Sequence, residues 1–247
     1  MDDSVKVTRK AEEKLAALFS VRKEFSPHLR KWEDRLLPDK YDHNCFEYTG
    51  QPTAEEFARA LAYQRENNCG FIKLEGNFPL QDSFGLEAGV TLTMVLKGDS
   101  SRWRRNREAA FGTPSLTELE ALEVKHFGSL YGEDFTRRNA RRLYEKLDYH
   151  GAYLGEKLAG ACYSFSADNT VCVDGLIVDE SCRHQYIATS LLAHIAEEAG
   201  SLLFLHADAD DTPKDMYAKM GFAVTDRLYE YSCTDLQKLL RETAQAR

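Results

Sequence analysis

The second half of the chain alternates between short apolar runs and segments whose apolar residues recur at helical spacing. Residues 171–178 form a β-branched run, and the next segment places Ile187, Leu191 and Ile195 on one helix face. The apolar run 202–205 is typical of a buried strand. This order predicts a strand, a polar turn, a helix and a second strand. A helix N-terminus directly after a strand presents unpaired N–H groups and a positive dipole end, so the turn is predicted to hold an anion such as a diphosphate.

The pattern predicts further elements on both sides of this segment. Ser115 and Glu118 form a capping box, which predicts a helix from there to about residue 130. A second helix is expected at 134–147. The other expected elements are strands at 150–155, 158–166 and 223–233, a short helix after Thr212, and a terminal helix containing Leu236 and Leu239.

The first half repeats the order strand, helix, strand, short helix, strand. Two helical segments are expected between residues 11 and 37, separated by Pro27. Thr53 and Glu56 form a capping box that opens a helix running to about Asn68. The remaining expected elements are strands at 45–49, 71–74 and 90–96 and a helical or irregular stretch at 79–86. The charged stretch 99–112 is interpreted as a linker between domains at 1–100 and 113–247.

Composition limits the classes of protein that fit. The 247 residues are 43% apolar, and no apolar stretch approaches the ~18 residues of a membrane span, so no membrane association is expected. The start of the chain lacks the pattern of a signal peptide, which favours a cytoplasmic protein with reduced thiols. Neither the six cysteines nor the seven histidines show ligand spacing, so no metal site is expected.

The net charge of −8 disfavours nucleic acid as a partner. Two basic runs stand against this average, Arg102–Arg107 and Arg137–Arg142. The simplest interpretation is a solvated linker for the first run and a solvated helix face for the second. The alternative is an intramolecular or subunit contact, which leaves a homodimer open.

Two short runs resemble the signatures of one enzyme family. Arg183-x-x-Tyr186-Ile187-Ala188 resembles the Arg/Gln-x-x-Gly-x-Gly/Ala signature of the GCN5-related N-acetyltransferases, the GNAT superfamily. Asp210-x-x-Pro213-x-x-Met216-Tyr217-x-Lys219-x-Gly221-Phe222 is similar to its second signature, Asn-x-x-Ala-x-x-Leu-Tyr-x-Lys-x-Gly-Phe. The resemblance covers about residues 113–233. Tyr186 replaces the usual glycine, Asp210 the usual asparagine and Pro213 the usual alanine.

This resemblance implies an α/β fold of the α+β type, with a mixed, mostly antiparallel sheet flanked by helices. Because the first half repeats this element order, our hypothesis is that residues 1–100 are a degenerate GNAT-like extension without a cofactor site; an unrelated α/β extension is the alternative. The resemblance also implies acetyl-CoA as cosubstrate, with the diphosphate on the loop. The implied contacts are Ile177, Val178, Arg183, His184, Gln185, Tyr186, Ile187, Ala188, Thr189, Ser190, Asp210 and Pro213.

The resemblance further implies roles in the reaction. Tyr217 is the expected general acid for the departing thiolate, and we expect Thr212, Pro213 and Gly221 to fix its helix. Asp174, on the strand before the loop, is the candidate base; its alternative is a solvated strand residue. His206, Asp208 and Asp210 could border the acceptor.

The resulting expectation is an acetyl-CoA-dependent N-acetyltransferase acting on a primary amine by direct transfer. The acceptor could be a small molecule, a peptide N-terminus or a lysine. The competing hypothesis is a non-catalytic acyl-CoA-binding or interaction module, suggested by Tyr186 and the degenerate first half.

Overall fold

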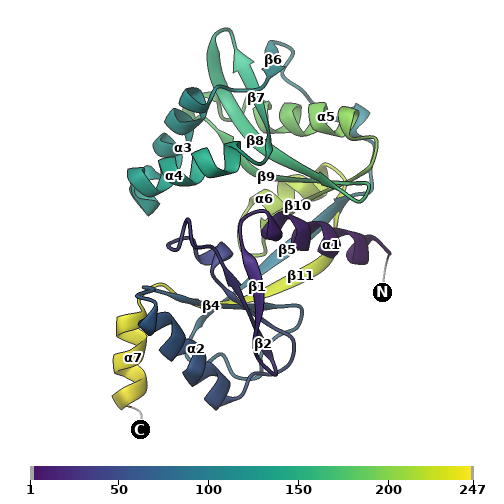
Figure 1. Ribbon diagram of the computed structural model, residues 1–247. Coiled ribbons are helices and arrows are strands. Elements are labelled where there is room, and N and C mark those ends of the chain that lie inside the picture. Colours follow the sequence, from purple (N-terminus) through teal and green to yellow (C-terminus); the bar gives the residue numbers. More distant parts are fainter. Residues whose placement is uncertain (1–2, 246–247) are drawn as a thin grey trace. The chain divides into compact units, whose positions relative to one another are not determined.

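The structure, a computed structural model, describes residues 3–245 and contains two compact units (Figure 1). Unit 1 comprises the N-terminal residues through Lys14, Met94–His206 and Thr212–Thr225. Unit 2 comprises Leu15–Thr93, Ala207–Asp211 and the residues from Asp226 onward. The two units interleave along the chain. Four elements contribute residues to both: α1 (Asp3–Ala17), β5 (Glu87–Leu96), β10 (Leu202–Asp208) and β11 (Phe222–Cys233).

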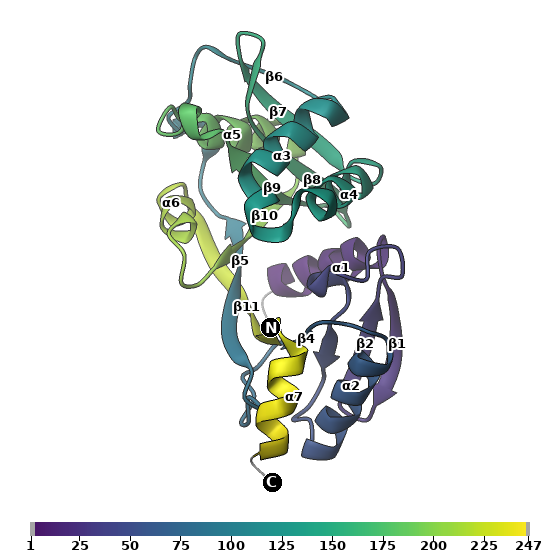
Figure 2. The ribbon, with the colours of Figure 1, turned by 90° about the vertical axis from the view of Figure 1, so that its left-hand side faces the viewer.

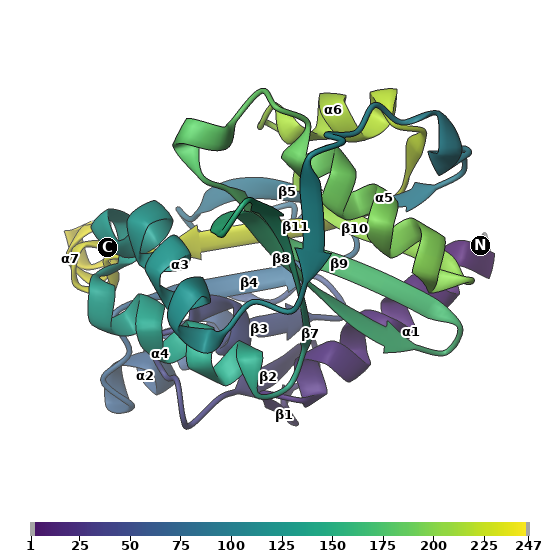
Figure 3. The same cartoon turned by 90° about the horizontal axis from the view of Figure 1, so that it is seen from above.

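Unit 1 is built on strands in the order β10-β9-β8-β7-β6. The strands β6 (Ala109–Gly112), β7 (Asp148–Leu154), β8 (Lys157–Ala167) and β9 (Thr170–Val178) pair antiparallel, and β10 pairs parallel to β9. Figures 1 and 3 show α3 (Leu116–Tyr131) and α4 (Glu133–Tyr144) on one face of these strands and α5 (Ile187–Ala199) on the other. The predicted mixed, mostly antiparallel sheet flanked by helices is confirmed.

Local sequence explains why these elements begin and turn where they do. The Ser115 hydroxyl accepts from the Glu118 N–H and the Glu118 carboxylate accepts from the Ser115 N–H, so α3 begins with the predicted capping box. Asp168 and Asn169 both have positive φ, which suits the two-residue hairpin turn between β8 and β9. Leu191 and Leu192 are fully buried beneath the sheet, each stabilising the unit by roughly 1.5–3 kcal/mol.

Unit 2 has strands in the order β1-β2-β3-β4-β11. Its strands β3 (Phe46–Tyr48) and β4 (Ile72–Gly76) are parallel and are joined by α2 (Ala54–Glu66). Figures 1 and 2 show α7 (Leu236–Gln245) beside α2. One apolar core unites this unit, drawing on both helices and the strands: Leu29, Phe46, Tyr48, Phe57, Ala60, Leu61, Ile72, Leu74, Leu86, Tyr231, Leu236 and Leu239.

Two expectations for the first half are wrong. Residues 21–33 form the hairpin β1 (Val21–Ser26) and β2 (Leu29–Glu33), where Leu29 and Trp32 had indicated a helix. Because β2 pairs with β1 on one side and β3 on the other, strand pairing overrides the helical spacing. The stretch 99–112 is not a plain linker either, since it contains a 3₁₀ turn, η2 (Ser100–Arg102), and β6, which pairs with β7. Residues 79–86 are irregular, one of the two outcomes expected.

Candidate functional site

The turn between β9 and α5 is fixed at its start by a buried carboxylate. Asp179 follows β9 directly, and its side chain accepts from Lys125 Nζ at 2.7 Å, Lys157 Nζ at 3.0 Å and the Ser181 N–H at 3.0 Å. Hydrogen bonds from Lys125 and Ser181, with help from Lys157, hold the pKa of Asp179 well below its ordinary value. Asp179 is therefore an ionised anchor that begins the turn, which continues through η3 (Glu180–Cys182).

The end of this turn leaves the helix N-terminus open. Tyr186 precedes α5 with φ of 62° in the left-handed region, and it provides no side-chain cap. The first turn of α5 contains no acidic residue. The N-cap residue therefore gives the first N–H groups of α5 no side-chain acceptor, and the end of the helix dipole is positive there. A helix N-terminus of this kind suits an anion such as a diphosphate.

Ser190 holds the turn together through buried hydrogen bonds. Its hydroxyl donates to the Tyr186 carbonyl at 2.8 Å and accepts from the Asn106 N–H at 2.8 Å, and Ser190 is 1% exposed. The Asn106 amide also donates to the Gln185 carbonyl at 3.1 Å. The hydroxyl of Ser190, one of the expected cofactor contacts, therefore links the turn to residue 106.

A pocket of about 540 Å³ lies beside the open end of α5. Its walls come from three segments of unit 1, namely the turn before α5, helix α6 (Pro213–Lys219), and the basic run that begins at Arg102. The lining residues are Arg102, Trp103, Arg104, Tyr186, Thr189, Thr212, Asp215, Met216, Lys219 and Met220. The pocket thus combines cations, exposed aromatic surface and the first turn of a helix.

The Arg102–Arg104 segment is held in this wall by aromatic contacts. The Trp103 indole N–H donates to the Met220 carbonyl at 2.7 Å, and its ring stacks on Phe222 with centroids 6.0 Å apart. The Arg104 guanidinium lies 4.3 Å from the centre of the Tyr186 ring, a cation–π contact. The interpretation of this run as a solvated linker is wrong, because the indole inserts beside α6 and brings both arginines to the pocket.

Tyr217 lies on α6, and two of the three residues expected to fix the ends of this helix do so. Pro213 occupies the first turn, and Gly221, at φ of 93°, follows the C-cap as expected. Thr212 precedes the helix but makes no side-chain cap, so that expectation is wrong. Tyr217 is 8% exposed and its ring contacts Phe222 at 5.9 Å, whereas its helix neighbours Met216 and Lys219 line the pocket.

The strands β9 and β10 stop pairing part of the way along. Their parallel register covers 170–173 and 202–205, after which β9 continues to Val178 without β10 as a partner. Asp174 and Gly175 stand where the pairing ends, opposite an irregularity in β8. Gly175 has φ of 62°, and a Cβ there would lie 2.5 Å from the Tyr163 ring, so only glycine fits. The backbone of Ile177 and Val178 lies beyond this point.

Asp174, the candidate base, and His206, expected to border the acceptor, both have side-chain partners. The Asp174 carboxylate accepts from the Tyr163 hydroxyl at 3.1 Å and from the Gly175 N–H at 2.7 Å. Burial, aided by Asp174, raises the pKa of Tyr163 well above its ordinary value, so Tyr163 stays a neutral donor. The His206 Nε2 lies 2.8 Å from Glu12 Oε1 of α1.

The predicted cofactor residues are brought together only in part. Tyr186 and Thr189 line the pocket, while Arg183, His184 and Gln185 are exposed in the turn. The Ile187 side chain is buried in the core, so only its backbone faces the turn. The prediction did not include Arg102, Trp103, Arg104, Met216 or Lys219. Asp210 belongs to unit 2, and its N–H donates to Asp208.

Most residues of this site lie in one segment of the chain that a family model matches. Residues 116–222 match the family model described as the acetyltransferase (GNAT) family. This segment is a GNAT domain, which supports a general acyl-transfer function. A search among curated proteins found no match. Within the described residues, every helix is too short or too polar to cross a bilayer.

Solved structures share the fold over most of the chain. A conserved protein of unknown function from Staphylococcus epidermidis is 18% identical, with a TM-score of 0.76 over 87% of this chain and 94% of its own. A GCN5-related N-acetyltransferase from Kribbella flavida is 14% identical, with a TM-score of 0.60 over 92% and 95%. A tandem GNAT protein from the clavulanic acid biosynthesis pathway is 14% identical, with a TM-score of 0.55 over 83% and 78%. The N-terminal half also resembles a GNAT fold.

Proposed function

We propose that the protein is an acetyl-CoA-dependent N-acetyltransferase that transfers an acetyl group directly to a primary amine. The observation that carries this proposal is the 540 Å³ pocket between the open N-terminus of α5, helix α6 and the Arg102–Arg104 segment. Acetyl-CoA supplies an activated thioester and a large anionic handle. The pocket combines the groups that such a handle requires.

The residues present fit this cosubstrate. The N–H groups at the start of α5 suit a diphosphate, and Thr189 in the same turn can donate its hydroxyl. Arg102, Arg104 and Lys219 supply positive charge for further phosphate oxygens. The backbone of Val178, where β9 no longer pairs with β10, can pair with the amides of the pantetheine arm.

In the proposed reaction the amine nitrogen bonds to the acyl carbon while the carbon–sulfur bond breaks. Tyr217 donates its phenolic proton to the departing sulfur, and a positioned donor of this kind contributes typically ~10²–10⁴-fold. Asp174 accepts the proton that the amine releases, directly or through water. Its bonds from Tyr163 and Gly175 fix the carboxylate where the pairing of β9 with β10 ends. Alignment of the two reactants supplies much of the remaining rate.

The basic face of α4 gives no reason to expect an anionic acceptor. Arg137 and Arg141 both pair with Glu120 on α3, and Arg138 pairs with Asp134 one turn away. These arginines are thus partly neutralised within unit 1. The proposed acceptor is therefore a primary amine on either a small molecule or a peptide.

The test begins with binding. Acetyl-CoA at ~100 times its dissociation constant should add about 2.7 kcal/mol to the free energy of unfolding, measured by thermal shift. Dephospho-CoA is the matched control for the cationic wall, and we expect it to bind more weakly. A panel of amines, followed by release of the CoA thiol, then reports transfer.

Three outcomes are distinct. Binding with thiol release on at least one amine supports the proposal. Binding with no transfer across a broad panel would support the acyl-CoA-binding module instead. Absence of any acetyl-CoA binding would overturn both.

A further inference from the structure

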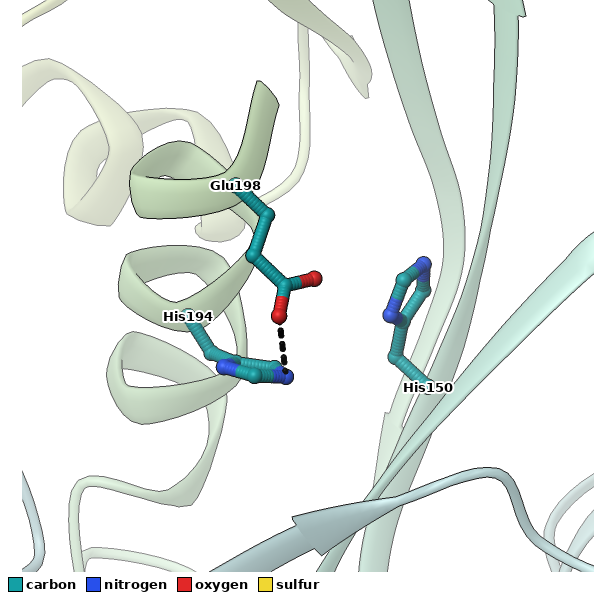
Figure 4. A group of neighbouring side chains, drawn as sticks. All are labelled: His150, His194 and Glu198. Carbon is teal, nitrogen blue, oxygen red and sulfur yellow. Dashed lines mark ion pairs between the residues drawn. The ribbon is translucent and has the colours of Figure 1, made fainter. Parts of the chain in front are cut away.

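Three side chains with metal-binding chemistry meet on unit 1, outside the pocket. His150 comes from β7, and His194 and Glu198 come from successive turns of α5 (Figure 4). One ligand atom from each residue lies within 4.8 Å of the other two. None of the three lines the 540 Å³ pocket, and none has a role in the proposed transfer.

His194 and Glu198 lie on the same face of α5, where both can act as ligands. Residues four apart on a helix lie one above the other, and His194 Nε2 is 3.6 Å from Glu198 Oε1. Their side chains are 29% and 61% exposed, so an ion from solvent can reach them. The Phe111 ring of β6 stacks on His194 with centroids 4.5 Å apart and planes 12° apart, which restricts the imidazole.

His150 completes the cluster from the neighbouring strand. Its Nε2 is 2.8 Å from the Ser164 hydroxyl on β8, which leaves the other ring nitrogen for the cluster. Figure 4 shows one ring nitrogen of His150 facing the side chains of His194 and Glu198. A metal-binding histidine almost always uses its second nitrogen for such an outer hydrogen bond, which fixes tautomer and orientation.

We propose that His150, His194 and Glu198 bind one divalent transition-metal ion of the zinc class. Two imidazoles and a carboxylate suit Zn²⁺, with water completing the coordination. Two bonds of about 2.1 Å span at most about 4.2 Å, so any pair of ligand atoms farther apart, within their 4.8 Å limit, must move closer. Glu198, the more exposed member of the helix pair, can move inward by rotating its side chain.

A bound ion would tie α5 to β7 and so stabilise unit 1. Spacing among cysteines and histidines does not reveal this site, because His194 pairs with a glutamate, Glu198, and the third residue comes from a distant strand. The alternative is an ordinary surface His–Glu pair on a helix, which binds no metal and contributes little to stability.

The test uses the full chain freed of metal by chelation. Zn²⁺ affinity is measured by calorimetry, and Co²⁺ is added to report coordination through its visible absorption. We expect one strong site and a higher melting temperature with Zn²⁺. Glu198→Gln and His194→Asn should weaken Zn²⁺ binding at least tenfold, and Ser164→Ala by roughly ten- to hundredfold.

Glu197→Gln is the matched control, since Glu197 is the adjacent glutamate on α5 and pairs with Arg105 instead. This variant should bind Zn²⁺ like the wild type. The proposal is overturned if wild type and Glu198→Gln bind Zn²⁺ equally, or if the wild type shows no strong site. Acetyl-CoA binding by Glu198→Gln should be unchanged, which separates this site from the pocket.

Discussion

The two units each contain a strand–helix–strand segment with parallel strands, and the helix N-termini differ. In unit 1 the segment is β9–α5–β10, and in unit 2 it is β3–α2–β4. Helix α2 begins with Thr53, whose hydroxyl accepts from the Glu56 N–H, while the Glu56 carboxylate accepts from the Thr53 N–H. Helix α5 begins with the left-handed Tyr186 and has neither cap nor acid. The two units therefore share a backbone motif, but the N-terminus of α2 is capped and closed to anions, whereas that of α5 is open.

The capped N-terminus of α2 is also covered by other residues of unit 2. The Glu56 carboxylate also accepts from the Ser26 hydroxyl at 2.7 Å and the His28 N–H at 3.0 Å. A carboxylate at the third helical position repels an incoming phosphate and uses the donors that would bind it. The comparison indicates that the residues of the first helical turn determine whether such a helix N-terminus can accept an anion.

The largest expected effect comes from removing the hydroxyl of Tyr217 on α6. Tyr217→Phe should lower turnover by roughly 10²–10⁴-fold through loss of the proton donor. Acetyl-CoA affinity should be almost unchanged, as measured by calorimetry beside steady-state rates.

Tyr131→Phe is the control, because it removes a hydroxyl from a half-exposed ring on α3. It should leave the rate unchanged. Full turnover in Tyr217→Phe would remove this phenol from the mechanism.

The next effect tests the first turn directly. Thr189 of α5 and Glu56 of α2 both stand at the third helical position. Thr189→Glu should weaken acetyl-CoA binding by roughly ten- to hundredfold, because like charges about 4 Å apart repel by about 4 kcal/mol near a surface, before screening by salt.

Thr189→Gln introduces a side chain of the same size as glutamate but without the charge. This variant should bind acetyl-CoA with an affinity within a few-fold of the wild type. Thermal unfolding distinguishes lost binding from lost folding, since a glutamate near a helix N-terminus stabilises the helix. Equal affinities in the two variants would show that the diphosphate does not lie at this turn.

These predictions depend on residues that the sequence revealed to different degrees. The β9–α5–β10 order was predictable because its strands are uniformly apolar and its helix has a clear apolar face. The hairpin β1–β2 was not, since Leu29 and Trp32 also fit helical spacing and only pairing on both sides makes them a strand. Local pattern cannot show which partner a segment finds.

The candidate site was likewise predictable only where its residues lie close together in the sequence. The turn at 183–189 and Tyr217 were found through motifs whose residues are close in sequence. The pocket wall at Arg102–Arg104 was missed, because its position depends on the bond from Trp103 to Met220, far along the chain. An arginine–tryptophan run in an acidic protein was the available signal, and solvation was the simpler interpretation.

A smaller effect is expected from opening the closed helix. Glu56→Gln should lower the free energy of unfolding by about 1–2 kcal/mol through loss of the capping box and its charged hydrogen bonds. Burial opposes ionisation of Glu56, but hydrogen bonds from Thr53, Ser26 and His28 outweigh it and lower its pKa to about 2. The lowered pKa stabilises the fold above the unfolded value of 4.5, and this stabilisation is lost as pH falls toward 2.

Denaturant unfolding between pH 2 and pH 7 measures both effects. The variant should lose part of the pH dependence in the range 4.5 to 2, whereas the exposed neighbour Glu55→Gln should behave as wild type. Glu56→Gln should also gain no acetyl-CoA binding in unit 2, since Ser26, His28 and Thr53 still cover the helix end. An identical pH profile in wild type and Glu56→Gln would refute the assigned cause.

The smallest effect concerns Tyr186, whose left-handed backbone keeps the first turn of α5 uncapped. That conformation costs a residue with a Cβ roughly 1–2 kcal/mol, and the stack of Arg104 on the ring offsets part of it. Tyr186→Gly should therefore stay within about 1 kcal/mol of wild type in denaturant unfolding. Tyr186→Ala loses the same stack but keeps the strain, so it should be less stable than the glycine variant by about 1 kcal/mol. If alanine and glycine were equally stable, the backbone at residue 186 would not be left-handed, and the open end of α5 would need another cause.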